Sequence, residues 1–218
     1  MISREISPGV FILEVEGQKR LATRSDDVVP VYGERIQEGY RLWDPFRSKL
    51  AALLLKGRRT RPLLERDAKV LYLGAATGTT VSHVSDIVRD GLVYAVEFSP
   101  RSMRDLIRLC ERRNNIVPIL ADASRPEEYA SLVEPVDLVY QDVSSRNQAE
   151  IVSNNCARYL KPGGELILML KTRSVDVTAI PEAVLQAETK KLQGLDLLPV
   201  LDLLPFHQDH FAIAGRKS

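Results

Sequence analysis

The chain has 218 residues, of which 44% are hydrophobic and 27% are charged. This size and composition suffice for one ordinary domain with a full core and a small additional module. Thirty basic residues nearly balance 29 acidic ones, and the net charge of +1 excludes a polycation that binds nucleic acid unaided. No apolar run approaches the roughly 18 residues of a membrane helix, and the first residues lack a signal-peptide pattern. We therefore expect a cytoplasmic protein without a membrane partner.

Basic residues nevertheless occur in two clusters. The first comprises Lys56, Arg58, Arg59 and Arg61, and the second comprises Arg101, Arg104, Arg108, Arg112 and Arg113. Both clusters fit a solvated surface as well as a phosphate-binding surface. If they contact phosphate, the near-neutral total charge predicts weak binding that depends on a partner.

Two cysteines are present, Cys110 and Cys156, and each lies in a helix-like stretch. Neither is close in sequence to another cysteine or histidine at a ligand spacing. We therefore expect reduced core thiols and no bound metal.

The first part of the chain predicts a small β-rich module. Residues Val10 to Thr23 alternate around Gly17 like a β-hairpin, and a stretch rich in proline and glycine continues to Gly39. A helix is then expected, with Asp44 as its cap and Phe46 on its apolar face, ending at Gly57. This module with its linking helix is assigned residues 1–57.

Residues 58–218 predict an α/β domain, because from Lys69 onward short apolar runs alternate with helical stretches. We expect a Rossmann-like parallel sheet with helices on both faces. The predicted strands are Val70 to Leu73, Leu92 to Glu97, Ile116 to Leu120, Val136 to Gln141, Glu165 to Leu170, Leu197 to Leu203 and Phe211 to Ala214.

The segment from Val70 to Thr80 is an apolar strand that enters a loop of small residues, followed by a helix near Val81. Small residues let backbone N–H groups approach a ligand at a helix N-terminus. The loop does not match the dinucleotide fingerprint, because Ala76 and Thr79 replace its second and third glycines. A tight strand-to-helix turn without a ligand is the alternative.

Acidic residues end the next two strands. Glu97 lies about 20 residues past the loop, where a carboxylate can accept both ribose hydroxyls, and Asp122 can accept from an adenine amino group. Either residue alone could be a helix cap. Together they indicate an adenosyl cofactor, and the irregular loop favours S-adenosylmethionine over a pyrophosphate-containing nicotinamide cofactor.

Three further polar residues adjoin predicted strands. Asp142 and Lys171 follow strands, and His210 precedes the last strand. In doubly wound sheets, ligands bind outside the carboxyl ends of the strands, so Asp142 and Lys171 should reach the cofactor's edge. His210 joins them if the last strand is antiparallel. A solvent-exposed strand end is the alternative for Asp142 and Lys171, and a lone histidine without a functional role is the alternative for His210. His83 and His207 are given no role.

Long stretches of the chain resemble the fibrillarin family in its short archaeal form. They include Val31-Tyr-Gly-Glu34, Tyr40 to Ala52 with Phe46-Arg-Ser-Lys49, Val70 to Asp86 with Gly78-Thr-Thr80, Val96 to Arg101 and Gln208-Asp-His-Phe211. The resemblance covers nearly the whole chain and is far more specific than a glycine-containing loop. It implies a class I methyltransferase sheet behind the family's N-terminal β domain.

The resemblance also implies an activity and partners. A fibrillarin-like chain is a 2′-O-methyltransferase that acts on rRNA and, in archaea, on tRNA within a C/D-box guide ribonucleoprotein. A guide RNA selects the nucleotide, a Nop-family scaffold protein holds the enzyme, and a kink-turn-binding ribosomal-type protein completes the particle. The chain lacks the Gly- and Arg-rich tail that accompanies nucleolar targeting in eukaryotic fibrillarin.

The resemblance places the family's catalytic group on Lys49, Asp142, Lys171 and His210. It places the cofactor pocket on Gly74, Gly78, Thr79, Thr80, Glu97, Phe98, Asp122, Ala123, Asp142, Val143, Ser144, Ser145 and Gln148. The family's Asp-Val-Ala-Gln-Pro-x-Gln segment reads Asp142-Val-Ser-Ser-Arg-Asn-Gln148 here. Ser145 therefore replaces the first glutamine of that segment.

The expected reaction is in-line displacement, in which an aligned RNA 2′ oxygen attacks the sulfonium methyl and loses its proton. We expect Lys171 to be the general base, because like-charge repulsion from Lys49 would favour its neutral form. Asp142 is expected to orient Lys171, and His210 to position Asp142 or the ribose. The alternatives are a methyltransferase for a non-RNA substrate and a non-catalytic subunit of an RNA particle.

Overall fold

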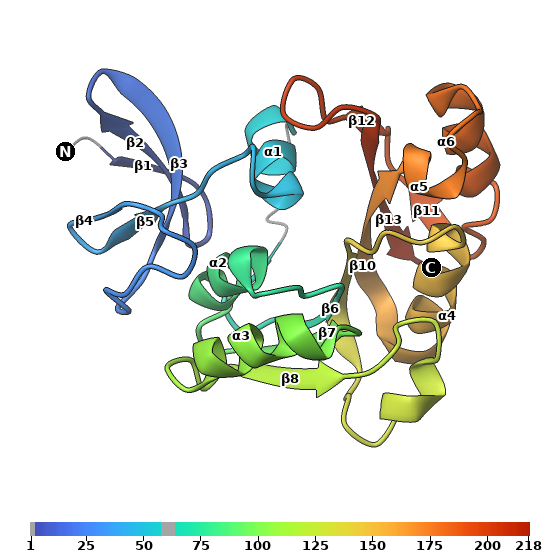
Figure 1. The fold of residues 1–218 in the computed structure, drawn as a ribbon, viewed down its shortest axis with the longest axis horizontal. Coiled ribbons are helices and arrows are strands. Elements are labelled where there is room, and N and C mark those ends of the chain that lie inside the picture. Colours follow the sequence, from blue (N-terminus) through green and yellow to red (C-terminus); the bar gives the residue numbers. More distant parts are fainter. Residues whose placement is uncertain (1–2, 58–63) are drawn as a thin grey trace.

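The computed structural model describes residues 3–57 and 64–218, which form two β-sheets joined by helices (Figure 1). Three arginines of the first basic cluster, Arg58, Arg59 and Arg61, lie outside the described residues. The predicted combination of a small β module and a Rossmann-like α/β sheet is confirmed.

The N-terminal sheet is antiparallel throughout. Its strands, in the spatial order β1-β2-β3-β5-β4, are β1 (Ser3–Ser7), β2 (Val10–Val15), β3 (Gln18–Arg24), β5 (Tyr40–Leu42) and β4 (Ile36–Gln37). The predicted hairpin is β2–β3, and its two-residue turn places Glu16 and Gly17 at φ values of 54° and 74°. Positive φ at both turn residues matches the right-handed twist of the flanking strands, which is why glycine is present here.

The larger sheet has the order β11-β13-β10-β9-β6-β7-β8, with β12 also paired to β13. Strands β6 to β10 run parallel, and β13 is antiparallel to β10 and β11. The bounds are β6 (Lys69–Leu73), β7 (Leu92–Glu97), β8 (Ile116–Leu120), β9 (Val136–Gln141), β10 (Leu160–Lys171), β11 (Leu195–Leu197), β12 (Leu201–Asp202) and β13 (His210–Lys217).

One predicted strand was wrong. The stretch from Leu197 to Leu203 is not continuous: β11 ends at Leu197 and β12 begins at Leu201. Pro199 lies between them and has no N–H group to donate to a ladder, which explains the break. The other predicted strands are present, and β10 begins earlier than expected, at Leu160.

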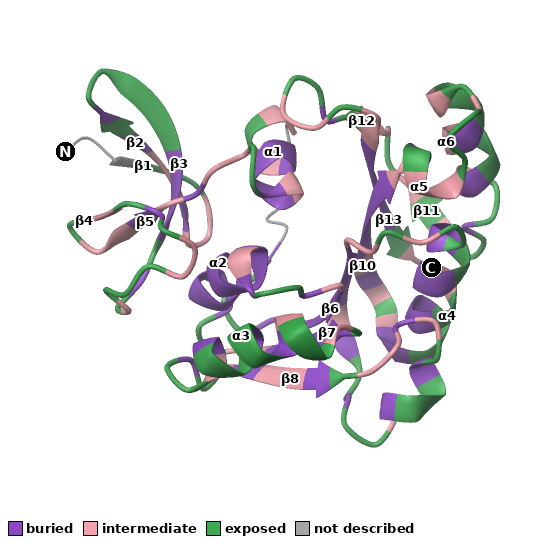
Figure 2. Ribbon diagram, in the orientation of Figure 1, coloured by how far each residue is buried: buried purple, intermediate pink, exposed green. Residues whose placement is uncertain are grey.

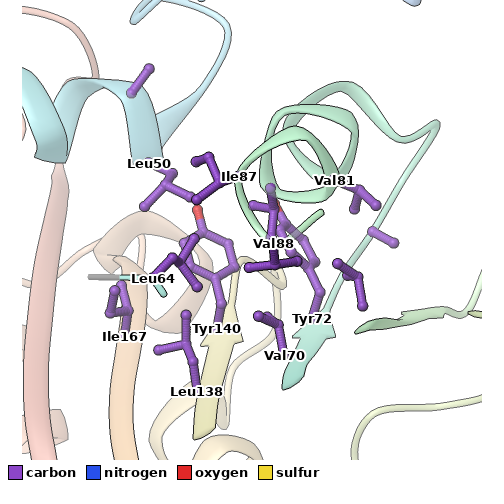
Figure 3. Close-up of a cluster of buried hydrophobic side chains, with 14 of the residues drawn as sticks. Leu50, Leu64, Val70, Tyr72, Val81, Ile87, Val88, Leu138, Tyr140 and Ile167 are labelled. Carbon is purple, nitrogen blue, oxygen red and sulfur yellow. The ribbon is translucent and has the colours of Figure 1, made fainter. Parts of the chain in front are cut away.

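Helices cover both faces of the larger sheet. On one face α1 (Lys49–Lys56), α2 (Thr79–Ile87) and α3 (Pro100–Cys110) pack on side chains such as Tyr72 and Tyr140, as Figure 3 shows in part. On the other face, η1 (Pro126–Tyr129), α4 (Gln148–Tyr159) and α6 (Pro181–Thr189) cover Leu71 and Leu166, while α5 (Thr172–Val175) follows β10. Burial on both faces explains why these strands are continuous apolar runs.

Helix α1 begins later than predicted. Its cap is Ser48, whose hydroxyl accepts from the Ala51 N–H at 3.3 Å. Asp44 instead closes its own turn by accepting from the Phe46 N–H at 2.9 Å, so helical hydrogen bonding starts after that turn. Phe46 is consequently 63% exposed and not part of the apolar face.

Helix α2 lies between the two sheets, and residues 80–87 are all buried (Figure 2). Its Asp86 carboxylate accepts from Arg41 of β5 at 2.7 Å and from Arg113 at 2.6 Å. Two guanidinium groups from different parts of the chain thus neutralise one buried carboxylate, as buried charges require. This ion-pair cluster joins the N-terminal sheet to the larger one.

A division of the chain between residues 57 and 58 remains a proposal. Helix α1 precedes that division in the sequence, yet Leu50 and Leu53 pack in the core of the larger sheet. Helix α1 therefore fixes the N-terminal sheet to the domain that follows.

Candidate functional site

The candidate active site lies at one edge of the larger sheet. Strands β6, β7, β8, β9 and β10 are parallel, so the polar residues that follow them meet at the carboxyl edge. His210 begins the antiparallel strand β13 and is paired in register with Lys171 at the end of β10. The prediction that His210 reaches the same edge as Lys171 is confirmed.

A cavity of about 400 Å³ opens at this edge, between the loops that follow β6, β7, β8 and β9. Among the proposed cofactor residues, those that line it are Gly74, Glu97, Phe98, Asp122, Ala123, Asp142, Val143, Ser144 and Ser145. Ala76 and Asn147, which lie in the predicted segments but were not singled out, also line it, and so does Ser124, which was not predicted. The volume lies within the range of small-molecule sites and suits a nucleoside-sized ligand.

Glu97 is the most buried carboxylate of this cavity, at 9% exposure. One carboxylate oxygen accepts from the Ala76 N–H and the other from the Ser99 N–H, both at 2.7 Å. Each oxygen keeps a further lone pair for a hydroxyl donor. The carboxylate is thus fixed with both oxygens able to accept from a ligand.

Asp122 provides a second anchored carboxylate on the neighbouring loop. Its oxygen accepts from the Ser124 N–H at 2.9 Å, and this bond to the charged form lowers the pKa of Asp122. Phe98 lies between the two acidic positions in the sequence and is 73% exposed. The cavity therefore combines two ionised acceptors with an uncovered aromatic ring.

Gly74 is required where the loop crosses Asp142. Its φ is +85°, and a Cβ atom at this position would lie 2.6 Å from the carbonyl oxygen of Asp142. The requirement is steric, because the backbone of the loop passes directly against the Asp142 backbone. Gly74 thereby sets the position of a proposed catalytic residue.

Four proposed cofactor residues do not line this cavity: Gly78, Thr79, Thr80 and Gln148. A Cβ at Gly78 would lie 2.5 Å from Leu109, so this glycine permits α3 to pack closely on the start of α2. The Thr80 hydroxyl donates to Ser48 Oγ at 3.0 Å and so fixes the cap of α1. Gly78 and Thr80 support the site through packing and capping.

Lys49 and Asp142 form an ion pair at the edge of the cavity. The Lys49 ammonium lies 2.7 Å from Oδ1 and 2.9 Å from Oδ2 of Asp142. Both side chains are about four-fifths buried, which shields the pair from solvent. We expected Asp142 to orient Lys171, and this was wrong: its carboxylate is paired with Lys49, and it forms no ion pair with Lys171.

The Lys171 backbone is held by the side chain of Gln148. Gln148 Oε1 accepts from the Lys171 N–H at 2.9 Å, and Gln148 Nε2 donates to the Lys171 carbonyl at 3.0 Å. Gln148 is fully buried and uses its amide for these bonds, which is why it is absent from the cavity wall. Within the described ranges, 3–57 and 64–218, Lys171 has no carboxylate partner.

Two histidines adjoin Lys49 and Asp142. Burial, and then the charge of Lys49, lowers the pKa of both His207 and His210. His207 Nε2 lies 2.8 Å from the Pro45 carbonyl oxygen, so its ring is bonded to the turn that leads into α1. The sequence analysis gave His207 no role. Its position three residues before His210 was the only feature of the sequence that could have indicated its place beside the site.

Two kinds of feature are absent from the part of the chain that the structure describes. No group of three or more His, Cys, Asp or Glu side chains there is arranged to hold a metal ion. None of its helices is long and apolar enough to cross a membrane.

A parallel sheet with an inserted antiparallel strand, and with anchored acids at the ends of β7 and β8, defines an S-adenosylmethionine-dependent methyltransferase of the Rossmann-like class. The family model described as Fibrillarin matches residues 1–218. The chain belongs to the fibrillarin family.

Individual relatives agree with this assignment. The chain is 53% identical over 217 residues to a fibrillarin-like rRNA/tRNA 2′-O-methyltransferase of Methanothrix thermoacetophila, covering 98% of this chain and 99% of the relative. It is 45% identical to Aeropyrum pernix fibrillarin, solved with natively bound S-adenosyl-L-methionine, with a TM-score of 0.87 and coverage of 98% and 99%. It is 44% identical to a chain of a fibrillarin/Nop5p complex, with a TM-score of 0.92 and coverage of 99% and 100%.

Proposed function

We propose that this protein transfers a methyl group from S-adenosylmethionine to the 2′ oxygen of guide-selected nucleotides in rRNA and tRNA. Two observations carry the proposal: Lys49 pairs with Asp142, which lines a nucleoside-sized cavity, and His210 lies in register with Lys171 at the same edge of the sheet. The Methanothrix thermoacetophila relative, which matches this chain over nearly its whole length and is named as an rRNA/tRNA 2′-O-methyltransferase, supports the proposal.

The cavity suits the adenosyl part of the cofactor. The fixed oxygens of Glu97 would accept from the ribose hydroxyls, and Asp122 would accept from the adenine amino group. The exposed ring of Phe98 would cover the adenine face. When bound, the cofactor supplies an electrophilic methyl group.

Lys171 is proposed as the general base that removes the 2′-hydroxyl proton. Its rival for this role is Lys49, but the Lys49 ammonium is engaged by both carboxylate oxygens of Asp142. Among residues 3–57 and 64–218, Lys171 has no such partner, and Gln148 fixes its backbone. The proton would move from the ribose oxygen to Lys171 Nζ, while His210 positions the ribose.

The acceptor should be presented by a ribonucleoprotein particle. A net charge of +1 provides little general attraction to RNA. We propose that a C/D-box guide RNA, a Nop-family scaffold protein and a kink-turn-binding ribosomal-type protein supply the placement. The fibrillarin/Nop5p complex supports the scaffold partner, and the archaeal relatives support a cytoplasmic location.

Transfer of labelled methyl from S-adenosylmethionine to a guide-complementary RNA tests this function. The assay compares the chain alone with the chain plus scaffold, kink-turn protein and guide, and the modified atom is then mapped. We expect a particle-dependent 2′-O-methyl at the guided nucleotide. Cofactor binding and particle assembly without transfer would instead indicate a scaffold subunit, and methyl on another atom would indicate another substrate.

A further inference from the structure

The side chain of His207 joins two segments that each lead to a residue of the site. His207 lies on the loop between β12 and β13, which Figure 1 shows beside α1. Its ring nitrogen Nε2 lies 2.8 Å from the carbonyl oxygen of Pro45, in the turn that leads into α1. A carbonyl oxygen can only accept, so Nε2 carries the proton of this bond. The bond thus connects the loop that precedes His210 with the turn that precedes Lys49.

A short turn, closed by its own hydrogen bonds, separates Pro45 from Lys49. The backbone N–H groups of Arg47 and Ser48 both donate to the Asp44 carbonyl at 3.1 Å. Ser48 is the cap of α1, and Lys49 is the first residue of that helix. Fixing the Pro45 carbonyl therefore restrains the start of α1, which carries the Lys49 ammonium.

On its other side, His207 adjoins the residue that holds the His210 ring. His210 Nδ1 lies 2.6 Å from the Gln208 carbonyl oxygen, so Nδ1 is the protonated nitrogen of that ring. Burial lowers the pKa of His210, which favours the neutral ring with an unprotonated Nε2. That nitrogen can accept a hydrogen bond from a ligand hydroxyl. The centroids of the two histidine rings lie 5.8 Å apart.

The ring of His207 is suited to a place beside the Lys49–Asp142 ion pair. Burial, and then the charge of Lys49, lowers the pKa of His207, while its bond to Pro45 and the charge of Asp142 oppose this shift. The ring is therefore a neutral donor at neutral pH. A lysine could donate the same bond, but it would place a second cation against Lys49.

Two further contacts hold the same loop against α1 and the turn before it. The rings of Phe46 and Phe206 meet edge to face, with centroids 5.1 Å apart, and Lys56 donates to the Leu204 carbonyl. Phe46 is 63% exposed, and Lys56 is the last residue of α1. Because these contacts remain when the His207 bond is removed, the loop should stay attached while its end near the site becomes looser.

We propose that His207 is a positioning residue for methyl transfer. Its bond to Pro45 fixes the backbone at Gln208, and the Gln208 carbonyl holds the His210 ring with Nε2 as an acceptor. His207 thereby sets the His210 ring at a fixed place relative to Lys49. This inference rests on the proposed function, because it takes methyl transfer to a ribose hydroxyl to be the reaction.

The test compares two substitutions of His207 in the complete particle with a guide, a target RNA and saturating cofactor. His207→Phe keeps a ring and removes the donor, whereas His207→Gln keeps a neutral N–H donor at a similar reach. Tyr159→Phe is the matched control, because it removes another side-chain bond to a proline carbonyl, that of Pro126 at 2.5 Å, on the opposite face of the sheet.

For each variant, kcat, KM for target RNA, cofactor affinity and the free energy of unfolding are measured. In addition, ring ¹⁵N NMR signals of the protein alone report which nitrogen of His210 carries the proton. The chain has three histidines, which simplifies their assignment.

We expect His207→Phe to lower kcat about tenfold, the effect of a displaced group at the site, with KM and cofactor affinity near those of the wild type. In this variant the proton of the neutral His210 ring should be shared between Nδ1 and Nε2, because the Gln208 carbonyl is no longer fixed. His207→Gln should keep kcat and the His210 signals near those of the wild type. Tyr159→Phe should lose as much stability as His207→Phe and keep both.

Four results would overturn the inference. They are a wild-type kcat in His207→Phe, a lowered kcat with unchanged His210 signals, an equal loss of kcat in His207→Gln, and an equal loss in the control. Failure of the proposed function is distinguishable, since the wild-type particle would then transfer no methyl to RNA. The ring signals of the protein alone would still test whether His207 orients His210.

Discussion

Lys49 contacts both carboxylate oxygens of Asp142, at 2.7 and 2.9 Å, although 93 residues separate them in the chain. Lys49 is carried by α1, next to the N-terminal sheet, and Asp142 follows β9 of the larger sheet. The ion pair therefore depends on how α1 packs on the sheet, and it leaves Lys171 without an acidic partner among the residues that the structure describes.

Replacing Asp142 by Asn should slow methyl transfer while the fold is retained. The substitution leaves the Lys49 ammonium about four-fifths buried and without its anionic partner, where a fixed carboxylate otherwise sets the electrostatics of the site. We expect the single-turnover rate at saturating cofactor and RNA to fall about a hundredfold. A wild-type rate would show that the Lys49–Asp142 pair has no part in the reaction.

Gly74→Ala should impair both stability and transfer. Position 74 has φ +85°, and the added Cβ would lie 2.6 Å from the Asp142 carbonyl oxygen, so Asp142 must shift. Gly17→Ala is the matched control, because its φ is +74° and no atom lies within 4 Å of the added Cβ. Both variants should lose about 1 kcal/mol or more of unfolding free energy to backbone strain.

Only the Gly74 variant should also lose transfer rate, because only there does the strain reach a residue of the site. Urea titration and single-turnover kinetics measure the two effects separately. Equal rates in the two variants would contradict the steric role of Gly74.

Gln148→Leu should affect Lys171 more than it affects the cofactor. The change leaves the partly buried N–H and carbonyl of Lys171 without their partners, which costs about 1–3 kcal/mol of unfolding free energy. Loosening of Lys171 should lower kcat about tenfold with little change in cofactor affinity.

Asn115→Leu is the control for Gln148→Leu. Asn115 donates to the carbonyls of Ser85 and Val88, at the opposite edge of the sheet. It should cost similar stability and leave kcat unchanged. If both variants lowered kcat alike, Gln148 would act only through general stability.

Acidification should destabilise the contact between the two sheets through His83. Burial, and then the charges of Arg41 and Arg113, lowers the pKa of His83 well below 6.5. The unfolded state then binds more protons, so the neutral ring stabilises the fold fully above about pH 6.5 and this stability is lost as the pH falls toward the lowered pKa. Urea titrations between about pH 7 and pH 5 should show a smaller loss for His83→Gln than for the wild type. Parallel curves would contradict this role.

Local patterns predicted most of the fold. Apolar runs located β6 to β9, because strands buried on both faces have no polar side. They could not locate the start of α1. An aspartate before a helical pattern can cap the helix or close a separate turn, and only the structure shows that Asp44 closes a turn. The same patterns also could not show that Pro199 divides the segment between β11 and β12.

The sequence predicted which residues lie at the site better than it predicted which of them contact one another. Strand ends brought Glu97, Asp122, Asp142 and Lys171 to one edge, because parallel strands share that edge. Which charges touch depends on tertiary packing, so the partner of Asp142 was predicted as Lys171 and is Lys49. The same packing turned Gln148 toward the Lys171 backbone and away from the cavity.

The most direct test of this account is the single-turnover rate of Lys171→Ala in the assembled particle, with cofactor and target RNA saturating. Glu97→Gln serves as the comparison, because it should weaken cofactor affinity about tenfold and keep the rate once the cofactor is saturating. The account predicts that Lys171→Ala binds the cofactor normally and forms no 2′-O-methyl product. A wild-type rate in Lys171→Ala would contradict the assignment of Lys171 as the base.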